Sequence, residues 1–143
     1  MKKTTEILNN YIESHKNYLE ICKIYNESRS AIHKLSKEIW SYIYENYAKY
    51  LEFGRDSYFD EWDLDNTNLT IQYYRAHYDL LKTEWFYIPL SVIYNDTWKE
   101  FIDEHFNKIK AEEEAENKIR EDREKEQRQK LYEKLKQEFE NGK

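Results

Sequence analysis

The sequence contains very little glycine, proline or cysteine. Its 143 residues include two glycines, one proline and one cysteine. So few helix breakers predict long elements joined by few turns, and they exclude a glycine-rich phosphate-binding loop. The single Cys22 excludes both an intramolecular disulfide and a zinc site built from several cysteines. A reducing compartment is then the expected environment.

Long hydrophobic runs and a secretory leader are also missing. The sequence holds no apolar run of about 18 residues, the length from which a transmembrane helix is expected. Its first residues lead into a polar, amphipathic stretch instead of the apolar core of a signal peptide. We therefore expect a cytoplasmic protein with no membrane partner.

Residues 5–53 contain neither glycine nor proline, and their apolar side chains recur at helical spacing. Several of these side chains are seven residues apart, which is typical of a coiled-coil seam. The seam is a candidate surface for oligomerisation. Its defining residues are Leu8, Tyr11, Tyr18, Tyr25, Ile32 and Ile39.

The middle of this region leaves two structures open. Residues 26–30 are polar, and Arg29 falls on an apolar position of the seam. One alternative is a single long helix. The other, which we prefer, is an antiparallel helical hairpin with Ser28 or Ser30 capping its second helix, although such a turn would lack glycine. In both cases Gly54 is expected to end the helix in the left-handed conformation.

The pattern changes after an expected linker at residues 55–68. Residues 69–74 alternate between apolar and polar side chains, and residues 85–90 place Phe86, Ile88 and Leu90 on one face. This alternation predicts a small two-stranded antiparallel hairpin. Pro89 has no N–H to donate, so the second strand should lie at an edge or end there.

The C-terminal part predicts one helix over residues 97–140. Thr97 and Glu100 match a capping box, and an apolar stripe continues to Ile109. Beyond Lys110, the predicted helix is stabilised mainly by pairs in which a glutamate precedes a lysine or arginine by four residues. We expect a mainly α, α+β fold with a compact body at 1–109 and a projecting charged helical extension at 110–143.

The sequence offers little for catalysis or metal binding. No histidine has an Asp, Glu, His or Cys three or four residues away, so no metal or cofactor is expected. Arg75, His77 and Asp79 form the one cluster suited to acid–base chemistry. A small enzyme using them is the least favoured hypothesis, because a polar strand connection explains the same residues.

Charge is concentrated in one segment. The net charge is −6, so no direct binding of nucleic acid is expected. Residues 52–65 contain six acidic residues against Arg55 alone, interleaved with aromatic side chains. Such a segment suits a basic groove on a partner protein, for example a nucleic-acid-binding enzyme, although a solvated loop is the simpler alternative. The candidate partner-binding residues are Asp56, Tyr58, Asp60, Glu61, Trp62, Asp63 and Asp65.

The middle of the chain also carries a resemblance. The pattern consists of Trp62-Asp63, a strand at 69–73, the run 86–90, and Asn95-Asp96 followed by Trp98. It is similar to a hairpin of small phage-encoded accessory proteins of unknown function, over about residues 60–105. The resemblance implies a phage or prophage protein that redirects or inhibits a host protein, and it implies no catalytic residue.

Two functional hypotheses follow. The first is a non-enzymatic, phage-type inhibitor or modulator of a host protein that acts in defence, such as CRISPR immunity, or in nucleic-acid processing. It would act in the host cytoplasm through the acidic and aromatic residues of the 56–65 segment. The alternative is a structural coiled-coil protein that forms a homodimer or larger homo-oligomer through the seam.

Overall fold

A computed structural model describes residues 2–77 and 80–142 of the chain. It is mainly helical, with one antiparallel sheet, and so confirms the predicted mainly α, α+β fold class. The chain divides into two compact units, residues 1–96 and residues 97–143, which are described separately below. The predicted boundary between residues 109 and 110 stays a prediction.

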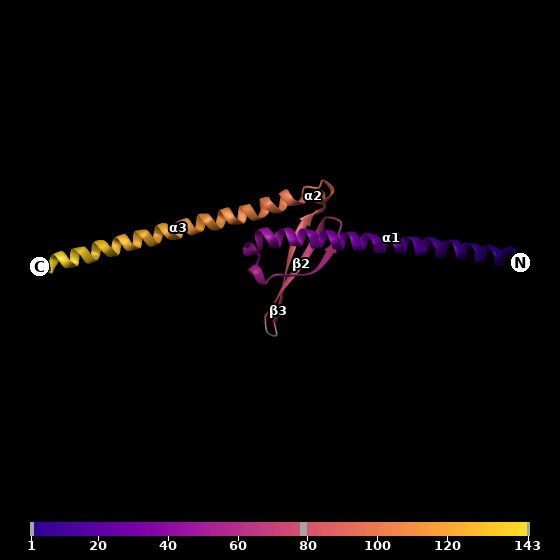
Figure 1. Ribbon diagram of the computed structural model, residues 1–143, viewed down its shortest axis with the longest axis horizontal. Coiled ribbons are helices and arrows are strands. Elements are labelled where there is room, and N and C mark those ends of the chain that lie inside the picture. The colour runs from indigo at the N-terminus through magenta and orange to yellow at the C-terminus, as the bar shows by residue number, and fades with distance from the viewer. Residues whose placement is uncertain (1, 78–79, 143) are drawn as a thin grey trace. The chain divides into compact units, whose positions relative to one another are not determined.

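The N-terminal helix α1 is continuous from Lys2 to Tyr47 (Figure 1). The preferred helical hairpin was therefore wrong, and the long-helix alternative is correct. Residues 26–30 are exposed, so their polar side chains are solvated without leaving the helix. Arg29, which interrupts the seam, lies with its guanidinium 5.4 Å from the ring centroid of Trp62. With neither glycine nor proline present, nothing in this segment breaks the hydrogen-bonded ladder.

The helix ends earlier than predicted, and Gly54 is not its terminal residue. After Tyr47 come two short 3-10 helices, η1 at Ala48–Tyr50 and η2 at Gly54–Asp56. Gly54 has a φ of +57°, the left-handed conformation that was predicted for it. This conformation is readily available to glycine. It turns the chain toward the sheet instead of closing α1.

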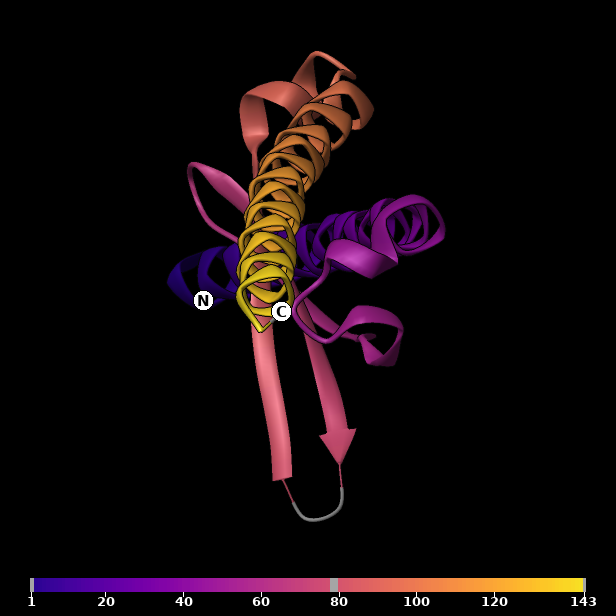
Figure 2. The same ribbon diagram turned by 90° about the vertical axis from the view of Figure 1, so that its left-hand side faces the viewer.

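The sheet has three strands, where two were predicted. β1 (Tyr58–Leu64), β2 (Asn68–His77) and β3 (Leu80–Pro89) pair antiparallel in the order β1-β2-β3 (Figure 2). The segment expected to be a linker, residues 55–68, therefore contains the edge strand β1. A bulge between Phe59 and Glu61 shifts its register against β2. β3 is the other edge strand and ends at Pro89, as predicted.

The core of the first unit lies between α1 and one face of the sheet. Ile39 and Ile43 on α1 have no exposed surface, and neither do Ile71 on β2 and Ile88 on β3. The Trp40 and Tyr73 rings stack with their centroids 5.2 Å apart, which places α1 directly against this face of β2. Burial also raises the pKa of the Tyr73 hydroxyl above its ordinary value. Fixing α1 here defines the opposite face of the sheet as the open one.

The second unit is dominated by one helix. The short α2 (Leu90–Tyr94) ends the first unit, and α3 runs from Trp98 to Asn141, which confirms the single helix predicted for residues 97–140. Trp98, Ile102 and Phe106 are buried, whereas residues 118–142 are all exposed. Two of the predicted charge pairs are formed, Glu124 with Arg128 at 3.6 Å and Glu126 with Lys130 at 3.1 Å.

Candidate functional site

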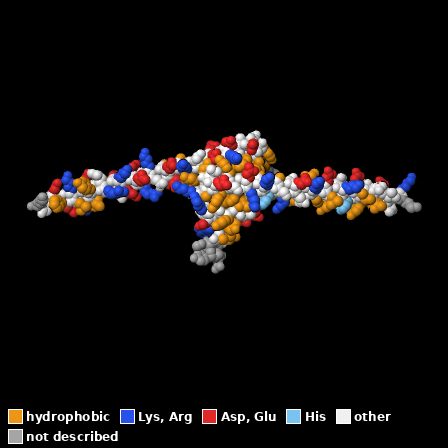
Figure 3. Space-filling view, viewed as in Figure 1, with side chains coloured by type: hydrophobic (Ala, Val, Ile, Leu, Met, Phe, Trp, Pro, Cys, Tyr) orange, Lys and Arg blue, Asp and Glu red, His pale blue; other side chains and the backbone are white. Residues whose placement is uncertain are grey.

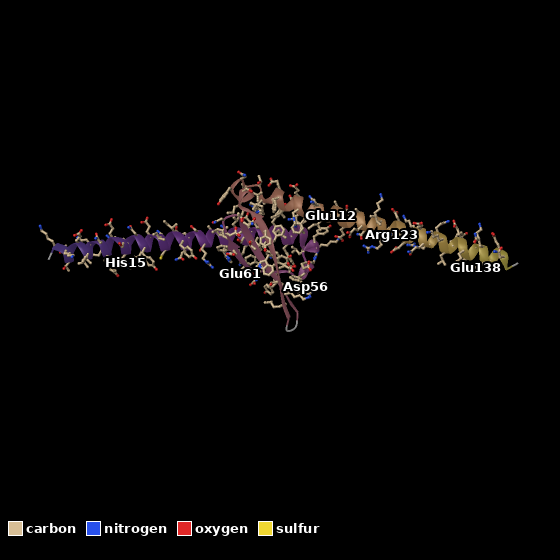
Figure 4. All side chains as sticks on the ribbon, turned by 180° about the vertical axis from the view of Figure 1, so that it is seen from behind. His15, Asp56, Glu61, Glu112, Arg123 and Glu138 are labelled. Carbon is tan, nitrogen blue, oxygen red and sulfur yellow. The ribbon has the colours of Figure 1, made fainter. Side chains whose placement is uncertain are left out.

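The predicted partner-binding residues surround strand β1. Five of them, from Tyr58 to Asp63, belong to the strand itself, while Asp56 ends η2 and Asp65 lies in the turn that leads to β2. Asp56 and Glu61 both lie in the part of the first unit that carries the sheet (Figure 4). A strand fixes the spacing and direction of these side chains in a way that a linker would not.

The register of the sheet aligns carboxylates with aromatic rings. Glu61 pairs with Gln72, which pairs with Trp85 on β3. One step along, Asp63 pairs with Thr70, which pairs with Tyr87. Successive side chains of a strand alternate between faces, and the neighbours Ile71, Phe86 and Ile88 are buried. Both rows therefore lie on the open face, opposite α1.

Hydrogen bonds connect the first row. The Gln72 side-chain amide donates through Nε2 to Asp60 Oδ2 at 2.9 Å. The Trp85 indole N–H donates to Gln72 Oε1 at 3.3 Å. Gln72 therefore holds a carboxylate of β1 and the indole of β3 at fixed positions. We call Asp60, Glu61, Asp63, Gln72, Trp85 and Tyr87 the acidic–aromatic surface.

Trp85 and Tyr87 are the exposed aromatic residues of this surface, with 48% and 59% of their area accessible. Neither was among the predicted site residues. Their exposure could have been predicted from the sequence. Placing Phe86 and Ile88 on the inner face of the strand puts their neighbours Trp85 and Tyr87 on the outer face. A groove of about 460 Å³ runs beside them and is lined by Glu61, Asp63 and Gln72 as well, and also by Arg29 and Trp62.

Trp62 differs from its neighbours on β1, although it also lines the groove together with Arg29. It pairs with Ile71, is half-buried, and lies under the guanidinium of Arg29 from α1. This cation–π contact ties β1 to the helix. Tyr58, by contrast, is 53% exposed, and its ring centroid lies 5.8 Å from that of Tyr74. Of the two aromatic residues predicted to bind the partner, Tyr58 is the more exposed.

Asp65 organises the turn between β1 and β2. Its Oδ1 accepts hydrogen bonds from the backbone N–H groups of Thr67 and Asn68, each at 2.7 Å, and from the Thr67 hydroxyl at 2.9 Å. These hydrogen bonds, led by the one from the Thr67 N–H, hold the pKa of the carboxyl below its ordinary value. Asp65 therefore has a structural role in the turn.

The residues of the predicted seam separate into two groups. Ile39 is fully buried in the core and Ile32 is half-buried. The four residues nearer the N-terminus are between 57% and 67% exposed, and they are Leu8, Tyr11, Tyr18 and Tyr25. Figure 3 shows hydrophobic side chains along this part of α1 beyond the sheet.

The cluster proposed for catalysis is only partly described. Arg75 lies in β2 with its guanidinium 5.4 Å from the ring centroid of Phe53. His77 ends the same strand, and Asp79 lies outside the described residues. Across residues 2–77 and 80–142, no three His, Cys, Asp or Glu side chains are grouped as a metal site requires.

The candidate site is therefore a surface, in which the acidic–aromatic residues of β1 and β3 are held by Gln72 of β2. Within the described part of the chain, no helix has the length and apolar character needed to cross a membrane. Comparisons with known protein families, curated proteins and solved structures give no match to this chain.

Proposed function

We propose that this protein is a non-enzymatic binding protein whose acidic–aromatic surface docks onto a basic surface of another protein. One observation carries the proposal: Trp85 and Tyr87 lie exposed in the same cross-strand rows as Glu61 and Asp63. Exposed Trp and Tyr side chains are the residue types that most often dominate binding energy at interfaces.

Charge and rigidity support the same function. Carboxylates at the rim steer a basic partner during encounter and favour the correct orientation. The hydrogen bonds of Gln72 hold Asp60 and Trp85 in place before binding, so less side-chain entropy is lost when the partner docks. A nucleic-acid-binding protein offers the complementary basic groove, and the carboxylates would compete with its phosphate ligands there.

The resemblance of residues 60–105 to a hairpin of phage accessory proteins extends the proposal. The partner is then a host protein of defence or nucleic-acid processing, and the chain acts as its inhibitor or modulator in the host cytoplasm. The structural alternative, a homo-oligomer built on α1, is treated below because the exposure of the seam favours it independently.

The test begins with capture of partners from a bacterial lysate, followed by purification of the captured protein and measurement of its dissociation constant. Reversing three charges, with Asp60→Lys, Glu61→Lys and Asp63→Lys combined, should abolish binding. The matched control reverses three glutamates of α3, with Glu112→Lys, Glu113→Lys and Glu114→Lys, and so changes net charge equally. Equal affinity of the two variants would refute the site.

The aromatic side chains are tested separately. Trp85→Ala should weaken binding by about 2 kcal/mol or more, the size expected of a central interface residue, which is roughly 30-fold in the dissociation constant. Tyr94→Ala, which removes an exposed tyrosine outside the surface, should leave affinity unchanged. Circular dichroism of each variant confirms that the fold is retained.

A further inference from the structure

The N-terminal part of α1 exposes an apolar stripe. Residues 2–31 are all exposed except for the half-buried Cys22. Nine large hydrophobic side chains in this segment have between 44% and 67% of their surface accessible. They are Ile7, Leu8, Tyr11, Ile12, Tyr18, Leu19, Ile21, Ile24 and Tyr25.

This stripe continues an interface that the first unit already uses. Steps of three and four residues lead from Leu8 through Tyr25 to Ile39 and Ile43, which are buried against the sheet. The same side of the helix is therefore covered at one end and accessible at the other. Arg29 is the one charged residue on this side of the accessible part. The other charged residues between Glu6 and Glu27 lie on the opposite side, and they are Glu6, Glu13, Lys16, Glu20, Lys23 and Glu27.

We propose that a second copy of this chain covers the stripe, with the two α1 helices antiparallel. One register pairs every member of the seam between residues 8 and 25. Leu8 meets Tyr25 of the second copy, Tyr11 meets Cys22, and His15 meets Tyr18. In heptad terms each of these is an a position facing a d position, the layer found in antiparallel coiled coils.

The flanking positions fit the same register. Ile12 of one copy faces Leu19 of the other, on the side of the helix pair next to the seam. No Lys, Arg, Asp or Glu occupies a seam or flanking position between residues 4 and 28. Closing the two helices over residues 4–28 therefore buries no charged side chain and brings no like charges into contact, and Arg29 lies at the end of the paired segment.

The ends of the helix favour the antiparallel arrangement over the parallel one. In this register Thr4 of the second copy reaches Arg29, where α1 meets β1 beside a pocket of about 320 Å³. A parallel pair would instead place Arg29 beside Arg29 of the second copy in the seam, which is unfavourable because like charges repel.

The first test is the mass of the purified protein in light scattering across a range of concentrations. We expect twice the chain mass of 17.8 kDa. Tyr18→Glu, which places a charge in the central layer, should return the mass to that of one chain. Asn17→Glu places the same charge outside the seam and should leave the dimer intact. A single-chain mass at all concentrations, or a mass above two chains, would overturn the proposal.

Disulfide cross-linking under mild oxidation tests the orientation. Cys22 faces Tyr11 in the antiparallel register, so Tyr11→Cys should yield a covalent dimer through Cys22 of the second copy. Tyr11→Cys combined with Cys22→Ser should give no covalent dimer. Glu13→Cys should give none either, because residue 13 points away from the seam. Efficient cross-linking of the native protein through Cys22 alone indicates a parallel pair and contradicts the proposal.

Discussion

The guanidinium carbon of Arg29 lies 5.4 Å from the ring centroid of Trp62, which joins α1 to β1 where the helix passes the edge of the sheet. This contact gives an arginine on the apolar side of the helix a partner, and it holds the half-buried Trp62 ring beside α1. An arginine at this seam position is therefore compatible with a continuous α1.

The Arg29–Trp62 contact should contribute measurably to stability. Arg29→Ala should lower the free energy of unfolding by about 0.5–1 kcal/mol, the range of partly exposed cation–π contacts. Trp62→Leu should also destabilise, and the double variant should lose less than the sum of the two, because one contact is shared. Urea unfolding of the four proteins measures the coupling. Strict additivity would show that the contact contributes nothing.

The two ends of α1 should respond differently to the same substitution. Ile39 is fully buried, so Ile39→Ala should lower the free energy of unfolding by about 2–5 kcal/mol through lost burial and a residual cavity. Ile24 is 56% exposed and lies outside the seam. Ile24→Ala should therefore change the free energy of unfolding by less than about 0.5 kcal/mol. Thermal or urea unfolding of the two variants measures the difference. Similar losses at both positions would contradict the placement of the core.

Asp65 should make stability depend on pH. Its folded pKa is lowered by three hydrogen bonds, so the carboxylate stabilises the fold above its ordinary pKa of about 3.9. That contribution is lost as the pH falls through the folded value. Asp65→Ala should therefore lower Tm at pH 7, and the difference from the native protein should shrink toward pH 2. Asp56→Ala serves as the control, and an equal Tm loss for both variants would contradict the role of the turn.

Hydrogen exchange should divide α3 into two parts. Amides near Ile102 and Phe106 should be well protected, since these side chains are buried. Amides beyond residue 118 should exchange faster, and faster still in about 1 M salt, because the Glu124–Arg128 and Glu126–Lys130 pairs are exposed and screened. The amides of β2 provide the reference. Equal protection of all α3 amides, with no effect of salt, would contradict the division of α3 into two parts.

Helices were easier to predict than strands in this chain. α3 matches its predicted range closely, because long runs of helix-favouring residues act locally. Thr97 is the N-cap residue as predicted, but its side chain makes no capping hydrogen bond. Arg29 on the apolar side of the helix suggested a turn at residues 26–30, but it contacts Trp62, which is distant in sequence. Local patterns carry no information about such a partner.

Strand β1 was missed for a different reason. The bulge between Phe59 and Glu61 places Phe59 and Trp62 opposite the core residues Tyr73 and Ile71, although they are three residues apart. The alternation that identifies a strand is thereby broken, and the acidic composition further disguises it. For the same reason Trp62 was taken for an exposed anchor, while Trp85 and Tyr87 could have been found from the alternation of β3.

The position of β1 at the edge of the sheet gives its carboxylates a second effect. An edge strand presents unpaired backbone N–H and C=O groups, which invite pairing with another such edge and growth into fibrils. Asp60, Glu61 and Asp63 lie along this edge, and the bulge at Asp60 twists it. Two such edges repel one another, so the residues proposed to attract a basic partner also keep the sheets of neighbouring molecules apart.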